Sequence, residues 1–153
     1  DGVLAKTRCN WRGVDLNRNL PTQDWTSDIK NIRYQPGPFA NSEPENQALV
    51  QFLQTKPPKL ILSLHSWFPV LNPNGDCLPE AECLSKWTGY NIEEDIGYPT
   101  PGSLGTYGHE NSIPTLTYEI ERDLAPKEIL RIHVPAILEA LKVTEIRYAQ
   151  TTN

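Results

Sequence analysis

The segment from Gly13 to Pro21 places an arginine guanidinium beside asparagine amides in a turn-prone stretch, Gly-Val-Asp-Leu-Asn-Arg-Asn-Leu-Pro. Asn17 and Arg18 form its central pair. A guanidinium fork next to an amide can bind a carboxylate through bidentate, charge-assisted hydrogen bonds, which give both strength and orientation. The segment therefore predicts a carboxylate-binding site. The alternative is a surface loop with a solvated arginine.

Two further residues with catalytic potential stand at the ends of predicted strands. His65 directly follows the apolar run 60–64, and α/β proteins place functional groups at the C-terminal ends of strands. It is a candidate metal ligand or general base, or else a structural histidine. Glu119 lies near the end of the run 114–120, where alternation places it on the same face as the two threonines of that strand. It is a candidate general acid or base, or else an edge charge at the surface.

The stretch 98–108 contains two prolines and three glycines, with Tyr107 among the glycines. This composition predicts a loop, which either folds over a ligand or is a plain connector. The chain has two histidines besides His65, His109 and His133. His109 lies between the loop and the next strand, and His133 lies on an apolar helical stretch, so we expect both to be structural.

These candidates must be positioned by the helices and strands that the patterning indicates. Ser42 and Glu45 have the spacing of a capping box, which predicts a helix that ends before Pro57. Apolar runs predict strands over 59–64 and 113–120, and helical periodicity predicts further helices. These further helices span 80–88 and 126–143, the second with a kink near Pro135. The order helix, strand, helix, strand, helix predicts an α/β fold.

Composition limits the remaining interpretations. A chain of 153 residues is long enough for one domain, predicted over 1–153, and too short for two comfortable ones. A net charge of −5 argues against a nucleic-acid partner, and no apolar run approaches the roughly 20 residues of a membrane span. Cys77 and Cys83 enclose five residues, so they form either a small disulfide loop or ordinary thiols.

The N-terminal region carries a separate expectation. The chain opens on Asp1 and contains no methionine, so we expect its N-terminus to be processed, cut or truncated. Two strands with three helices also make a poor finished domain. We therefore expect N-terminal strands to be missing and the incomplete sheet to associate with the missing segment or with another copy.

Taken together, these motifs resemble the M14 family of zinc carboxypeptidases. The resemblance rests on Gly-Val-Asp-Leu-Asn-Arg-Asn, the Pro-Glu-x-x-Ala-Leu helix, Leu-His-Ser after a strand, and Thr-Tyr-Glu-Ile, in that order, over 1–143. The loop Tyr-Pro-Thr-Pro-Gly-Ser-Leu-Gly-Thr-Tyr is similar to the compact bacterial branch, which includes murein peptide amidases and D,L-carboxypeptidases. The resemblance implies a mixed sheet flanked by helices.

The resemblance also implies roles for individual residues. His65 matches the third zinc ligand, and Glu119 matches the glutamate that deprotonates the zinc-bound water and protonates the leaving amine. Asn17 and Arg18 match the pair that grips the substrate's terminal carboxylate. An upstream arginine polarises the scissile carbonyl in the family. Arg8 is the preferred match, and Arg12 is its rival. Tyr107 matches the family's mobile loop tyrosine, in a loop that is shorter here.

One departure limits what the resemblance implies. The family's other two zinc ligands lie in a His-x-x-Glu motif, which does not occur in this chain, whereas zinc sites usually need three protein ligands. We therefore interpret the chain as the C-terminal portion of the catalytic domain, from a zinc carboxypeptidase or murein peptide amidase, and expect it to be inactive alone.

Two other functions stay open. The chain can be a non-catalytic module that binds peptide or murein C-termini through Asn17 and Arg18. It can also carry a rearranged metal site built from its three histidines, which the spacing does not support. The compartment, bacterial cytoplasm or periplasm, is left undetermined by the sequence.

Overall fold

The computed structural model describes residues 2–150, which form two compact units. Within this range, unit 1 comprises residues 2–58 and 99–111, and unit 2 comprises residues 59–98 and 112–150. Each unit has its own secondary structure and its own buried residues. The single domain over 1–153 stays a prediction.

Unit 2 is built on a four-stranded mixed sheet with the order β1-β4-β2-β3. β1 (Ile61–Trp67) runs parallel to β4 (Thr115–Glu121), β4 runs antiparallel to β2 (Val70–Asn74), and β2 runs parallel to the short β3 (Asn91–Ile92). The predicted α/β class is confirmed. Two of the four strands were missed, because β3 has only two residues and β2 contains Pro73 and two asparagines, which are poor strand formers.

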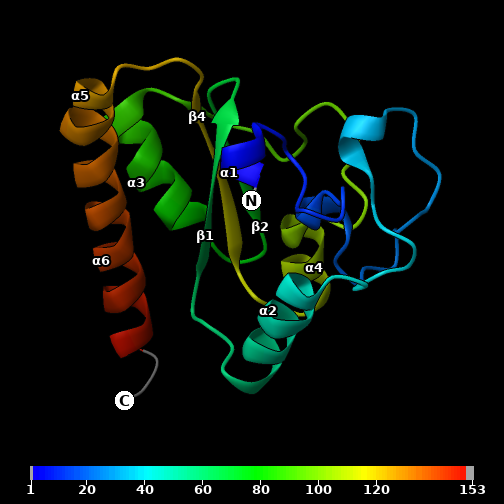
Figure 1. Cartoon of the computed structure of the whole chain (residues 1–153). Helices are drawn as coiled ribbons and strands as arrows, with labels where there is room; N and C mark the ends of the chain where they lie inside the picture. Colours follow the sequence, from blue (N-terminus) through cyan, green and yellow to red (C-terminus); the bar gives the residue numbers. More distant parts are fainter. Residues whose placement is uncertain (1, 151–153) are drawn as a thin grey trace. The chain divides into compact units, whose positions relative to one another are not determined.

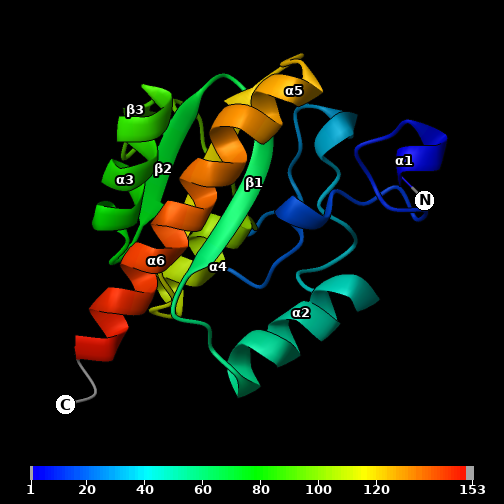
Figure 2. The same ribbon diagram turned by 90° about the vertical axis from the view of Figure 1, so that its left-hand side faces the viewer.

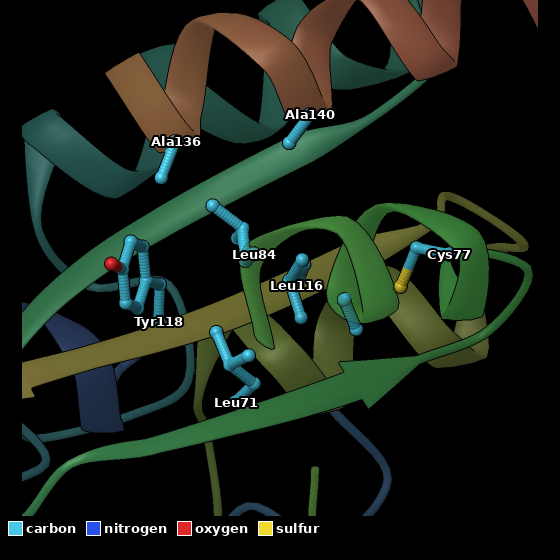
Figure 3. Packing of buried hydrophobic residues seen from close by; sticks show 8 residues of the cluster. Leu71, Cys77, Leu84, Leu116, Tyr118, Ala136 and Ala140 are labelled. Atoms are coloured by element: carbon cyan, nitrogen blue, oxygen red, sulfur yellow. The ribbon is translucent and has the colours of Figure 1, made fainter. Parts of the chain in front are cut away.

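The helices of unit 2 cover one face of this sheet (Figures 1 and 2). α3 (Leu78–Thr88) and α6 (Val134–Gln150) pack there, and alternate residues of the strands face them. Leu71 of β2, with Leu116 and Tyr118 of β4, meets Leu84 of α3 and two alanines of α6 in a buried core (Figure 3). The opposite residues of each strand, among them His65 and Glu119, therefore belong to the other face of the sheet.

The long C-terminal helix is interrupted, although not at the proline itself. α5 (Pro126–Glu128) continues into η3 (Ile129–His133), a π-helical turn, and then into α6. Pro135 cannot donate a backbone hydrogen bond and its ring crowds the preceding turn. The wider π turn just before it accommodates that crowding, so the helix continues to Gln150 rather than ending near residue 143.

Cys77 and Cys83 are both free thiols. Cys77 is the residue before α3 and is buried, Cys83 lies within the helix, and neither forms a disulfide. Burial raises the pKa of the Cys77 thiol to about 11, so it stays protonated and behaves as a small core residue.

Unit 1 consists of short helices joined by irregular chain. Its helices are listed here in chain order: α1 (Gly2–Ala5), η1 (Leu16–Arg18), η2 (Ile32–Tyr34), α2 (Pro44–Thr55) and α4 (Leu104–Glu110). The predicted loop over 98–108 is therefore wrong from Leu104 onwards. Ser103 caps α4 by accepting a hydrogen bond from the Thr106 amide, a local signal that the surrounding glycines and prolines concealed.

The predicted capping box before α2 is not formed. The residue at the cap is Glu43, which makes no side-chain cap bond, while the Ser42 hydroxyl donates to the Glu43 carboxylate (2.7 Å). Glu43 is fully buried and also accepts from Asn10. Burial by itself raises its pKa, but these two hydrogen bonds and the nearby Arg12 charge lower the pKa below its ordinary value. Ser42 thus serves a buried carboxylate instead of the helix end.

No helix among residues 2–150 is long and apolar enough to cross a lipid bilayer.

Candidate functional site

The predicted carboxylate-binding pair lies on η1, a single 3-10 turn in unit 1. Asp15 caps this turn, because its Oδ1 accepts a hydrogen bond from the Asn17 amide at 3.2 Å. Two buried asparagines hold the turn from behind. Asn19 donates to the Pro36 and Phe39 carbonyls, and Asn46 donates to the Leu16 carbonyl at 2.8 Å. The turn is thus fixed by polar contacts from distant parts of unit 1.

The side chain of Asn17 is oriented by the start of α4. Its Oδ1 accepts a hydrogen bond from the Leu104 backbone amide at 2.8 Å. Because a backbone amide can only donate, this contact assigns the oxygen to that side and turns the NH2 group the other way. Among residues 2–150 no acceptor is recorded for that NH2 group. It is therefore a donor suited to a carboxylate oxygen.

The neighbouring segment approaches η1 closely. Gly102 has a φ of +72° and donates its amide to the Thr22 hydroxyl, and a Cβ at this position would stand 2.3 Å from the Arg18 carbonyl oxygen. Only glycine fits both the left-handed backbone and the contact. Within the stretch predicted as a loop, Gly102 is thus needed for close packing.

Arg8 joins the same cluster. Its Nε pairs with Asp15 Oδ2 at 2.6 Å, and Asp15 is buried. The guanidinium groups of Arg8 and Arg18 both lie against the ring of Tyr34, at 5.3 and 5.4 Å from its centroid. The rival candidate, Arg12, lies near Glu43 instead, with 3.5 Å between Arg12 Nε and Glu43 Oε2. The structure therefore brings Arg8, and not Arg12, beside Asn17 and Arg18. Its catalytic role stays a prediction.

Tyr107 does not lie in a loop. It belongs to α4, and its side chain is 2% exposed, with no hydrogen-bond partner for its hydroxyl among the described residues. A side chain in this position cannot contact a ligand unless α4 moves. The substrate-binding role of Tyr107 stays a prediction, although its burial does not favour the role.

His65 and Glu119 are neighbours in unit 2. They are register partners on the parallel strands β1 and β4, and their side chains share the face opposite to the helices. The Nε2 atom of His65 lies 3.0 Å from the Ser63 hydroxyl, and Glu119 is 9% exposed. His65 lies within β1 rather than after it, since the strand continues to Trp67. A nitrogen ligand and a carboxylate thus lie side by side.

The surroundings of the other two histidines differ from those of His65. His133 is buried on the helix-covered side, where its Nδ1 makes a short hydrogen bond with the Tyr118 hydroxyl, and His109 is exposed on α4. Within residues 2–150 no three His, Cys, Asp or Glu side chains come together to hold a metal. The three-histidine site therefore finds no support among the described residues. His65 supplies one candidate zinc ligand, and the described residues do not form a complete zinc site around it.

Two positioning residues were missed by sequence reasoning. Asp15 links Arg8 to the Asn17 backbone, and Tyr34 contacts both arginines. Asp15 had a local signal, since an aspartate two residues before Asn17 can form a side-chain turn. Tyr34 had none, because its contacts join residues far apart in the sequence.

Comparisons with known proteins agree with this arrangement. A sequence model of the zinc carboxypeptidase family matches residues 1–121. Murein peptide amidase A of Vibrio campbellii is 33% identical over 135 residues, which cover 78% of this chain and 52% of that protein. Murein peptide amidase A of Escherichia coli K12 is 28% identical over 134 residues, covering 78% of this chain and 53% of that protein. The chain thus spans about half the length of these curated relatives.

Solved structures show the same fold. Murein-tripeptide amidase MpaA from Escherichia coli O157 has a TM-score of 0.76 at 24% identity, covering 94% of this chain and 63% of that chain. Bovine thrombin-activatable fibrinolysis inhibitor, solved with tick carboxypeptidase inhibitor, has a TM-score of 0.69 at 21% identity, covering 95% of this chain and 60% of that chain.

Proposed function

Because this chain belongs to the zinc carboxypeptidase family, we propose that it carries the proton-transfer and substrate-binding residues of a peptidase or amidase. The reaction is hydrolysis of a peptide or amide bond next to a free terminal carboxylate, in a peptide or murein peptide. The observation that carries this proposal is the pairing of His65 with Glu119 on one face of the sheet.

Each residue then has a defined task. Glu119 is the group that takes a proton from the attacking water and returns it to the leaving amine. Arg8, oriented by Asp15, stabilises the negative charge that develops on the scissile carbonyl oxygen. Asn17 and Arg18 hold the terminal carboxylate of the substrate, so that the bond next to it is the one presented for cleavage.

Zinc is the metal of this family, and His65 is the proposed ligand in this chain. One imidazole holds zinc weakly, because protein zinc sites use three or four protein ligands. We therefore infer that the 153 residues alone retain little zinc and little activity.

The first test is elemental analysis of the purified chain after dialysis. We expect well below one zinc per chain, and His65→Ala should lower the residual zinc further. About one tightly held zinc per chain would contradict weak binding. It would also require further ligands to be identified.

Glu119→Gln tests the proton-transfer role. The test uses a form of this protein that binds zinc and hydrolyses a peptide with a free C-terminus. In that form the substitution should lower kcat by at least 10²-fold, because the glutamine side-chain amide cannot accept the proton. The zinc content should not change. Substantial residual turnover would contradict the role of Glu119.

A binding module is the second candidate. The observation that favours it is that Arg8, Asn17 and Arg18 converge in unit 1, whereas the described residues form no complete metal site. A binding module would bind carboxylate-terminated peptides without zinc, and Arg18→Ala would weaken this binding. Equal affinity for a peptide and its C-terminal amide would count against it.

A further inference from the structure

A hollow of about 720 Å³ lies in unit 1, and Arg8 is among the residues that line it. Its size is within the range of small-molecule sites, roughly 300–1,000 Å³. Six of the residues that line it are Lys6, Arg8, Cys9, Trp11, Ile32 and Arg33. None of the described residues that line the hollow is acidic.

The charge of the hollow is opposite to that of the whole chain. The chain has a net charge of −5, whereas three cationic side chains face this one space. Arg8 is paired with the buried Asp15, but Lys6 and Arg33 make no ion pair with any residue in the described range 2–150. Cations gathered in a concave surface raise the local concentration of anions.

Apolar side chains stand beside these cations. Trp11 and Ile32 both line the hollow, and each is 76% exposed. Large apolar side chains left this exposed next to fixed charges offer contact area to a ligand that is part apolar and part anionic, as an acidic peptide is.

The hollow is also adjacent to the predicted carboxylate site. Arg8 lines the hollow, and its guanidinium shares the ring of Tyr34 with Arg18. Arg8 of the hollow and Arg18 of the predicted carboxylate site therefore contact the same aromatic ring. A peptide whose terminal carboxylate is held by Arg18 can place a second acidic group in the hollow.

We propose that the hollow of Lys6, Arg8 and Arg33 is a second anion subsite, which selects peptides carrying a carboxylate in addition to the terminal one. The inference rests on the proposed function, because it assumes that Asn17 and Arg18 bind the terminal carboxylate. It adds a preference for acidic peptides, with Arg33 as the main selecting residue.

The test compares two peptides that differ by one charge, acetyl-Ala-Glu-Ala-Ala and acetyl-Ala-Gln-Ala-Ala, both with a free C-terminus. Calorimetric titration of the whole chain in EDTA should give about two- to fivefold tighter binding of the glutamate peptide, the size of one exposed ion pair. Arg33→Gln should reduce the ratio of the two affinities to about one without weakening the binding of the glutamine peptide. Arg33→Lys should keep part of the preference for the glutamate peptide, because lysine retains the positive charge.

Lys30→Gln is the matched control, since Lys30 is an exposed cation of unit 1 that does not line the hollow. It should leave the ratio unchanged. A ratio of one in the unaltered chain, a ratio that survives Arg33→Gln, or no binding of either peptide would overturn the proposal. Because the ratio needs neither zinc nor turnover, a glutamate preference in a chain without activity would separate this inference from the proposed reaction. Arg18→Ala should weaken the binding of both peptides by the same factor. This variant therefore tests the terminal-carboxylate site alone.

Discussion

At the scale of single residues, the chain depends on buried polar groups that orient exposed ones. Asp15 is buried and accepts from both Arg8 and the Asn17 amide. One carboxylate therefore helps to orient both the proposed carbonyl-polarising arginine and the carboxylate-binding turn, together with the Tyr34 ring and the two buried asparagines.

Asp15→Asn is expected to destabilise unit 1. The amide keeps an acceptor for the Asn17 N–H but loses the ion pair with Arg8, so the free energy of unfolding should fall by about 1–3 kcal/mol. Urea unfolding monitored by circular dichroism measures this change. Asp28→Asn removes an exposed carboxylate of unit 1 that has no side-chain partner among residues 2–150. A loss of equal size in Asp28→Asn would show that the effect is one of net charge.

His133 makes the stability of unit 2 depend on pH. It is buried against Tyr118 and Tyr90, and desolvation lowers its pKa below the ordinary 6.5, with the Glu121 charge opposing this shift. The folded state therefore binds fewer protons than the unfolded state. Stability should be full above pH 6.5 and fall as the pH drops below it.

The expected loss of unfolding free energy between pH 7.5 and 5.5 is at most about 1.4 kcal/mol, the limit for a histidine that binds no proton in the folded state over this range. Urea unfolding at a series of pH values measures it. His133→Gln should flatten this dependence, although it lowers the overall stability. His109→Gln, a change at an exposed histidine, should leave the dependence intact. If the unfolding free energy of His133→Gln depended on pH as strongly as that of the unaltered chain, the pH dependence would have to come from other groups.

At the scale of secondary-structure elements, the short helices of unit 1 depend on close backbone contacts. α4 begins where Ser103 caps it, and its first amide orients Asn17. Gly102, one residue before that cap, packs against the Arg18 carbonyl. The segment that looked like a mobile loop therefore supports the carboxylate-binding turn.

Gly102→Ala should destabilise unit 1 by more than about 2 kcal/mol. The added Cβ would meet backbone atoms of Arg18 at a distance that real structures do not show, in addition to the cost of a positive φ. Gly13→Ala is the matched control, because Gly13 also has a positive φ, but apart from its chain neighbours no atom of the described residues lies within 4 Å of the added Cβ. Thermal unfolding of the two variants separates the steric effect from the backbone effect. Equal losses would contradict the close contact.

At the scale of the whole molecule, the proposed functional residues belong to two compact units. Arg8, Asn17 and Arg18 lie in unit 1, and His65 and Glu119 lie in unit 2. Unit 2 also presents an apolar edge. Within residues 2–150, β1 pairs only with β4, and Leu64 of β1 is 54% exposed. An open strand edge with exposed leucine is a surface that favours association.

Leu64→Lys should therefore weaken self-association of the chain by about tenfold, because a charge on an edge strand opposes pairing. Sedimentation equilibrium over a range of concentrations measures the association constant. Leu78→Lys, at a half-exposed leucine on α3 rather than at the edge strand, should have little effect. A chain that remains monomeric at all concentrations would contradict this expectation.

The sequence by itself determined the elements whose pattern is local. Alternation in β4 correctly assigned Glu119 to the face away from the core, and apolar periodicity located α3 and the start of the C-terminal helix. The residue types also indicated the chemistry, because carboxylate binding, metal ligation and proton transfer each require particular functional groups. Such patterns can be read from a sequence because neighbours along the chain determine them.

Only the tertiary structure decided which of these residues come together. Arg8 pairs with Asp15 whereas Arg12 lies near Glu43, and the common contact of Arg8 and Arg18 depends on Tyr34, which lies in a distant turn. The pairing of His65 with Glu119 depends on the register of two strands more than 50 residues apart. Such contacts arise when loops close and side chains pack, and a local sequence pattern contains no information about either.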